Sequence, residues 1–134
     1  MTVATYFNPG NLPTNPAYTQ VVRVSAGADT IYVGGQNGVD GAGRLVGTDL
    51  KSQARQAFTN VQSCLRAAGA SIEHVVKWTI LVQEGEPLQD GFAAYREVWG
   101  QRPNPPALTV ARVSGLAVPG ALVEIDAVAA VPAS

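Results

Sequence analysis

The sequence predicts an α+β domain in which two helices cover one face of a mixed β-sheet. Two segments, residues 49–68 and 88–99, repeat apolar side chains at helical spacing. Strand-like segments lie before, between and after them without the strict alternation of a doubly wound parallel sheet. The chain has 134 residues, of which 46% are hydrophobic and 14% charged, which suffices for one core. We therefore expect a single domain over residues 1–134.

The first third of the chain predicts short strands joined by glycine-rich turns. Residues 1–16 are rich in Asn, Pro and Gly, which indicates a loop containing a short strand at 5–7. The segments TQVVRVS at 19–25 and TIYVG at 30–34 are β-prone, and the turn AGAD between them predicts a hairpin. Residues 35–47 contain five glycines and predict a loop.

Two amphipathic helices follow from the spacing of their apolar residues. In residues 49–68 these residues form one stripe, Thr48 or Asp49 can cap the start, and Gly69 suits the end. The second helix, at 88–99, has an apolar stripe of its own. Its members are Leu88, Phe92, Tyr95 and Trp99.

Three further strands are expected at 75–82 (VVKWTILV), 107–113 and 121–131. Pro105 and Pro106 stand directly before the second of them, where proline is tolerated because it has no N–H to donate. With both helices on one face, the other face would hold several apolar side chains, which open water disfavours. These are Val75, Leu81, Leu108, Val110 and Leu122. A partner subunit is the simplest cover for them.

Charge and composition exclude several classes of function. The net charge is −1 without runs of Lys or Arg, so we expect neither nucleic-acid binding nor attachment to an anionic membrane. A single cysteine, Cys64, excludes an internal disulfide and Cys-rich zinc sites, and we expect no metal. No signal peptide or membrane-spanning apolar run is evident, so the expected location is the cytoplasm.

For three candidate features we favour a structural role over a functional one. His74 precedes a strand and is expected to be exposed or to cap. Cys64 belongs to the apolar stripe of its helix, which predicts a buried thiol rather than a reactive one. The stretch GGQNGVDGAG matches neither a P-loop nor a dinucleotide fingerprint. It is a flexible loop, or else a wall of a small-molecule pocket whose backbone approaches the ligand.

Glu124 and Asp126 alternate within the apolar segment VEIDAV, so both side chains point to one face of a strand. Carboxylates in such a setting are paired, hydrogen-bonded or functional. Lys77 and Arg112 occupy strands that could neighbour them. A salt-bridged sheet face and a role in a site are equally acceptable interpretations.

Four segments, in this order and spacing, resemble the reactive-intermediate deaminase (Rid, or YjgF-like) family over nearly the whole chain. They are YVGGQNGVDGAGRLVG, SQARQAFTNVQSCLRAAGASIEHVVKWTILV, PPALTV and ALVEIDAVA. The resemblance implies a chorismate-mutase-like α+β fold and a homotrimer with small-molecule sites at the subunit interfaces. It also implies hydrolysis of enamines or imines to keto acid and ammonia, with no cofactor.

The family supplies a cation for the substrate carboxylate from an arginine in a Pro-Ala-Arg-Ser/Thr pattern, which reads Pro-Ala-Leu-Thr here with Leu108 in the arginine's place. Three further positions depart from the family's residues: Gly34 for a serine, Phe92 for an asparagine and Val110 for a cysteine. The family's other site positions are retained as Tyr18, Gly35, Gln36, Thr109 and Glu124, the last of which activates water in the family. Arg112 shares a face with Leu108 but lies about 13 Å along the strand, too far to replace the arginine.

From these residues we expect Glu124 and Tyr18 to be catalytic in a mostly apolar interfacial pocket. Losing a bidentate ion pair predicts weak or no activity on small amino-acid-derived imines and a larger, less anionic substrate. One alternative is a genuine imine deaminase that binds the carboxylate through backbone N–H groups near Gly35 and Thr109. Another is a non-catalytic ligand-binding or interaction trimer.

Overall fold

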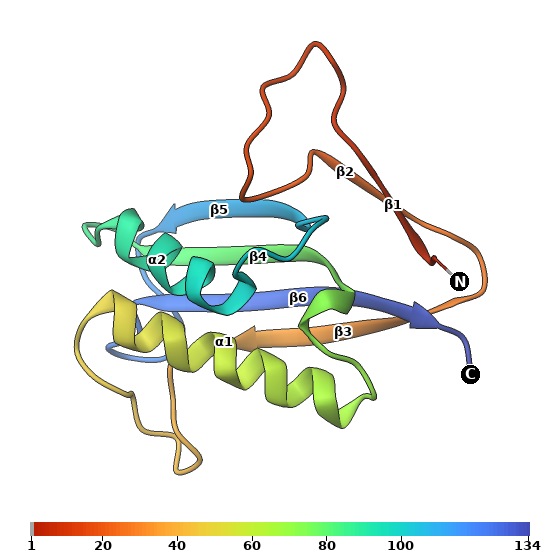
Figure 1. Ribbon diagram of the computed structural model, residues 1–134. Helices are drawn as coiled ribbons and strands as arrows, with labels where there is room; N and C mark the ends of the chain where they lie inside the picture. The colour runs from red at the N-terminus through yellow and green to blue at the C-terminus, as the bar shows by residue number, and fades with distance from the viewer. Residues whose placement is uncertain (1) are drawn as a thin grey trace.

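A computed structural model describes residues 2–134 and shows both helices on one face of a four-stranded sheet with the strand order β3-β6-β4-β5 (Figure 1). The α+β class is therefore confirmed. The elements are β1 Ala4–Phe7, β2 Val21–Val24, β3 Ala28–Gln36, α1 Leu50–Ala67, the 3₁₀ turn η1 Ile72–His74, β4 Val75–Gln83, α2 Leu88–Trp99, β5 Ala107–Val113 and β6 Val123–Pro132. Neither helix in this part of the chain is long and apolar enough to span a membrane.

The sheet is mixed because its strands are connected in two ways. β6 lies between β3 and β4 and is antiparallel to both. β5 is parallel to β4, and α2 forms the crossover that a parallel pair requires. β5 is consequently an edge strand of the described sheet, with one row of backbone groups facing away from β4.

The hairpin predicted between the second and third strands is wrong. β2 pairs with β1, from Ala4 opposite Val24 to Phe7 opposite Val21, whereas β3 pairs with β6. The turn sequence indicated a change of direction, which the structure has at Gly27 with φ of 84°. Turn chemistry does not determine which strand is the better partner, and seven residues of β3 pair with β6.

The main core lies between the sheet and the helices and is centred on three aromatic rings. Trp78 of β4 meets Phe58 of α1 edge-on at 5.4 Å between ring centroids, and Tyr95 of α2 at 6.2 Å. Such pairs add to the free energy gained from burial alone. A smaller cluster on the opposite face seats the β1–β2 hairpin, where Ala4 packs with Val76 and Ala130.

The expectation of an apolar uncovered sheet face is also wrong. A β-bulge between Val75 and Lys77 turns Val75 into the main core, where it is fully buried. The face away from the helices, which we call the open face, instead carries mostly polar side chains. The polar ones are Tyr32, Lys77, Thr79, Thr109, Glu124 and Asp126, and the apolar side chains Leu81, Val113 and Val128 share the face with them.

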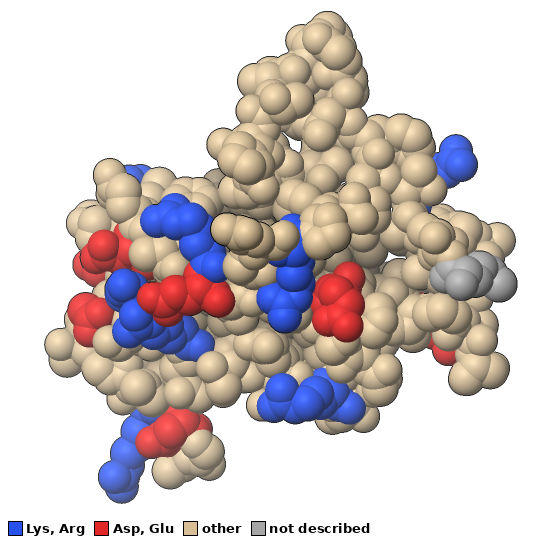
Figure 2. Space-filling model, viewed as in Figure 1, with Lys and Arg blue, Asp and Glu red and all other residues tan. Residues whose placement is uncertain are grey.

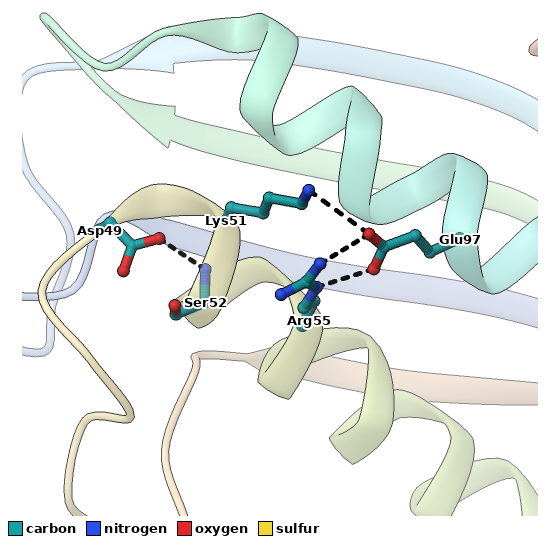
Figure 3. Close-up of polar contacts among 5 residues, drawn as sticks. All are labelled: Asp49, Lys51, Ser52, Arg55 and Glu97. Atoms are coloured by element: carbon teal, nitrogen blue, oxygen red, sulfur yellow. Dashed lines mark hydrogen bonds and ion pairs between the residues drawn. The ribbon is translucent and has the colours of Figure 1, made fainter.

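An ion-pair cluster joins the exposed sides of the two helices (Figure 3). Both Nε and Nη2 of Arg55 donate to the Glu97 carboxylate at 2.7 Å, and Lys51 Nζ lies 3.4 Å from it. The two cations lower the pKa of Glu97 to about 2, and the hydrogen bonds from Arg55 are the largest cause of this shift. Asp49 caps α1 through a hydrogen bond from the Ser52 amide at 3.0 Å.

The Glu97 pair predicts a small, acid-sensitive contribution to stability. Because the pKa in the folded protein is below the unfolded value of about 4.3, the contribution is present above pH 4.3 and lost as pH falls towards 2. Glu97→Gln should lower the Tm slightly at pH 7, and the difference from wild type should vanish near pH 2. Thermal melts at several pH values measure this, and an unchanged Tm difference at low pH would contradict it. Salt should weaken the effect.

Candidate functional site

The start of β5 is fastened to the N-terminal loop. Thr19 is buried, its hydroxyl donates to the Pro105 carbonyl at 2.6 Å, and its amide donates to the Pro106 carbonyl at 3.1 Å. Tyr18, directly before Thr19, is half-buried, and its amide contacts the Asn15 carbonyl at 3.4 Å. The loop that carries Tyr18 is thereby held beside the strand that carries Leu108.

Leu108 faces the helices and packs against the main core. Parallel pairing sets it opposite Trp78, whose side chain points into that core, and partners in register share a face. The Trp78 indole N–H has no hydrogen-bond acceptor among residues 2–134. Leu108 is therefore half-buried in apolar surroundings rather than exposed on the open face.

Val110 and Phe92 line a narrow apolar slot between α2 and the sheet. The slot holds no polar lining atom, and its remaining walls are Ile80, Val82, Leu88 and Gly91. Val110 pairs with Ile80 in register and so faces α2. Two of the positions where the resemblance places polar family residues thus meet in one apolar cavity.

Glu124 lies on the open face, where it is half-buried and sits opposite Leu81. It has no ion-pair partner within the described residues. Asp126 shares the face, as the alternation predicted. Lys77 Nζ donates instead to the hydroxyls of Thr79 at 3.1 Å and Thr109 at 2.9 Å. The salt-bridged interpretation of this face is therefore not what the structure shows.

Gly35, at the end of β3, makes room for the Glu124 carboxylate. The pairing of β3 with β6 shifts between Val33 and Gln36, which marks a bulge. A Cβ added at Gly35 would lie 2.7 Å from Glu124 Oε2, whereas one at Gly34 meets nothing within 4 Å. Gly35 is therefore the position where the backbone comes close to the candidate acid or base.

Gly35→Ala should displace the Glu124 side chain with little effect on folding. The atoms in the way belong to a half-buried side chain, so we expect less than about 1 kcal/mol of lost stability. Any turnover that uses the carboxylate should fall about 10-fold or more. Gly41→Ala, where a Cβ meets nothing within 4 Å, is the matched control. Equal activity of both variants in a steady-state assay would contradict the prediction.

One chain does not bring all the predicted site residues together. Leu108, Val110 and Phe92 lie on the helix side of the sheet. Thr109 lies on the open face with Glu124, but two strand spacings and two residues along the strands, about 12 Å in all, separate them. The cause is the alternation of side chains along β5, which sends neighbouring residues to opposite faces.

The residues expected to be structural have structural roles. Nδ1 of His74 accepts from the Ser71 amide at 3.0 Å and so caps η1. Cys64 is partly buried against the main core. Within residues 2–134 no group of three or more His, Cys, Asp or Glu side chains is placed to hold a metal ion.

Sequence reasoning missed Gln53, a buried amide of α1 that binds the segment leading into β6. Its Nε2 donates to the carbonyls of Gly47 at 3.2 Å and Gly120 at 3.3 Å, and its Oε1 accepts from the Leu122 amide at 2.8 Å. It thereby fastens both loops that lead to the open face to α1. Its place on the apolar side of α1, three residues after Leu50, was the available signal.

Comparison with known proteins identifies relatives over most of the chain. The family described as endoribonuclease L-PSP matches residues 10–131. Proteins named 2-iminobutanoate/2-iminopropanoate deaminase from Capra hircus and Homo sapiens are 38% and 36% identical over 115 residues, which is 84% of this chain and 78% of each relative. This chain is also similar to a crystal structure of YyfB from Yersinia pestis, described as a protein of unknown function of the conserved Rid family. The superposed region spans 97% of this chain and 100% of YyfB. Its TM-score is 0.84 at 28% identity.

Proposed function

The chain belongs to the endoribonuclease L-PSP (Rid, YjgF-like) family, and from this premise we propose that it hydrolyses an enamine or imine. We propose further that this substrate is larger and less anionic than the imine of pyruvate. The observation that carries the proposal is the half-buried Glu124 carboxylate beside Gly35, on a face that leaves it without a cationic partner among residues 2–134. The apolar residues Phe92, Leu108 and Val110, at positions where the family pattern has polar ones, support the preference for apolar groups.

The proposed reaction needs one group that moves protons. Glu124 takes a proton from water as the water oxygen bonds to the C=N carbon, and the nitrogen receives a proton. In the resulting carbinolamine the carboxylate takes the hydroxyl proton and the amine is protonated, so that the C–N bond breaks, ammonia leaves and the carbonyl remains. A carboxylate is sufficient for both transfers, and the scheme requires no electron acceptor.

We also propose that the working form is a homotrimer whose sites lie between subunits. One chain separates Leu108 and Glu124 on two faces of the sheet, so a second chain is the simplest way to complete a pocket. Arg23 is the first charged residue of the chain, and the projecting N-terminal segment shows only uncharged side chains in Figure 2. Its surface includes large exposed apolar side chains: Phe7, Leu12, Val21 and Val24.

A specific observation favours a second candidate, the genuine deaminase of small 2-imino acids. β5 is an edge strand, so backbone N–H groups beside Thr109 point away from β4 and remain available to a carboxylate. Two relatives are also named for that activity.

The experiment is a comparison of imines generated in situ from alanine, leucine and phenylalanine, together with sedimentation of the protein. We expect a higher kcat/KM for the leucine and phenylalanine imines, by about 10-fold or more because their side chains bury more apolar surface in the interfacial pocket, and the mass of a trimer. A preference for the alanine imine would favour the second candidate. No turnover with any of the three, which all carry a carboxylate, would contradict the second candidate, and no turnover with their methyl esters either would contradict the first.

A further inference from the structure

A groove of about 260 Å³ separates the segment at residues 15–17 from α2. Its floor is formed by Tyr95 and Trp99, which are only 2% and 4% exposed. Phe92 forms one wall and also lines the apolar slot beside Val110. The groove and the slot are therefore neighbours that share the Phe92 side chain as a wall.

The groove is held open by hydrogen bonds rather than by loose packing. Tyr95 Oη donates to the Ala17 carbonyl at 3.0 Å across its base. The Ala17 amide in turn donates to Asn15 Oδ1 at 2.8 Å. The segment is fixed further by the two hydrogen bonds that Thr19 donates to the carbonyls of Pro105 and Pro106 before β5. A ligand would enter a preformed site, which reduces the ordering cost of binding.

Arg96 gives this groove a positive charge without an internal counter-ion. It lies one helical turn after Phe92 and is exposed, and it makes no ion pair within residues 2–134. The adjacent Glu97 is occupied by Arg55 on the α1 side. Arg102 Nη1 donates to the Val98 and Trp99 carbonyls, which offsets the negative end of the helix.

We propose that this groove binds the carboxylate of a ligand with a flat apolar body, with the carboxylate on Arg96 and the body against Phe92. The guanidinium offers a planar pair of donors that matches a carboxylate, and the aromatic wall suits a ring. The inference rests on the proposed function in one respect. If the ligand is the substrate, Arg96 supplies from α2 the cation that the family pattern places at Leu108.

The test is a direct binding measurement by titration calorimetry, without turnover. Phenylacetate is the probe, and 2-phenylethanol is the neutral analogue with the same ring. We expect phenylacetate to bind about 10-fold more tightly than the alcohol and to weaken as salt is added. Arg96→Gln should weaken phenylacetate about 10-fold, to the level of the alcohol. Arg44→Gln, which removes an exposed arginine of the 37–47 loop, should change nothing.

Equal affinity for phenylacetate and 2-phenylethanol in the wild-type protein would overturn the inference, as would undiminished phenylacetate binding by Arg96→Gln. Thermal melts of both variants confirm that each is folded. The readout separates this inference from the proposed function. If the protein binds phenylacetate through Arg96 but turns over no imine, only the proposed function is overturned. If it turns over imines but does not bind phenylacetate through Arg96, only the inference about the groove is overturned.

Discussion

Glu124→Gln is expected to lower kcat for imine hydrolysis about 100- to 10,000-fold, the usual contribution of a positioned acid or base. Glutamine keeps the shape of the side chain beside Gly35 but cannot accept the proton of the attacking water. Because Glu124 has no ion-pair partner among residues 2–134, the change removes no salt bridge there and should leave the Tm close to wild type. Steady-state assays on the best imine found for the wild type measure the loss.

Asp126→Asn is the matched control for this prediction. Asp126 is on the same strand and the same open face, two residues away, and is half-buried like Glu124. The Asp126→Asn variant should retain a kcat within about threefold of wild type, since no contact places Asp126 beside Gly35. Equal losses in both variants would mean that the charge of the face matters, and not the position of one carboxylate. Full activity of Glu124→Gln would remove its catalytic role.

Leu108→Arg is expected to raise kcat/KM for small imino acids about 100-fold, by restoring the cation of the family pattern. A charge-assisted pair in a partly desolvated site is worth several kcal/mol, and some of that is lost because the surroundings are apolar. The same surroundings predict a cost: Leu108 packs against the main core, so the longer side chain should lower stability by about 1–3 kcal/mol. Assays with the alanine-derived imine and chemical denaturation measure the two effects.

Leu108→Met separates the charge from the change of shape. Methionine is long and flexible and fills apolar space, so it should cost less than about 1.5 kcal/mol and give no gain in activity. A wild type that already hydrolyses the alanine imine well would contradict the interpretation of Leu108 as a lost function. Carboxylate binding by the edge of β5 would then be the better account.

Elements with strong periodicity were predictable from the sequence. The helical stripe that begins at Leu50 needs one face buried wherever the helix packs, and β4 is apolar enough to require a central place. The capping roles of Asp49 and His74 are local and were predictable for the same reason. Strand pairing was not, because the short turn after β2 favoured β3 as its partner, whereas β2 pairs with β1 across the long loop at 8–20.

The sequence by itself determined the α+β class, the positions of both helices, the shared face of Glu124 and Asp126, and the family resemblance, since each depends on local spacing or on an ordered set of motifs. Only the tertiary structure decided which residues become neighbours. The bulge after Val75 sends that side chain to the core, and the parallel register of β5 sends Leu108 to the core and Thr109 to the open face. Pairing energies between distant segments set that register, and no local pattern along the chain encodes them.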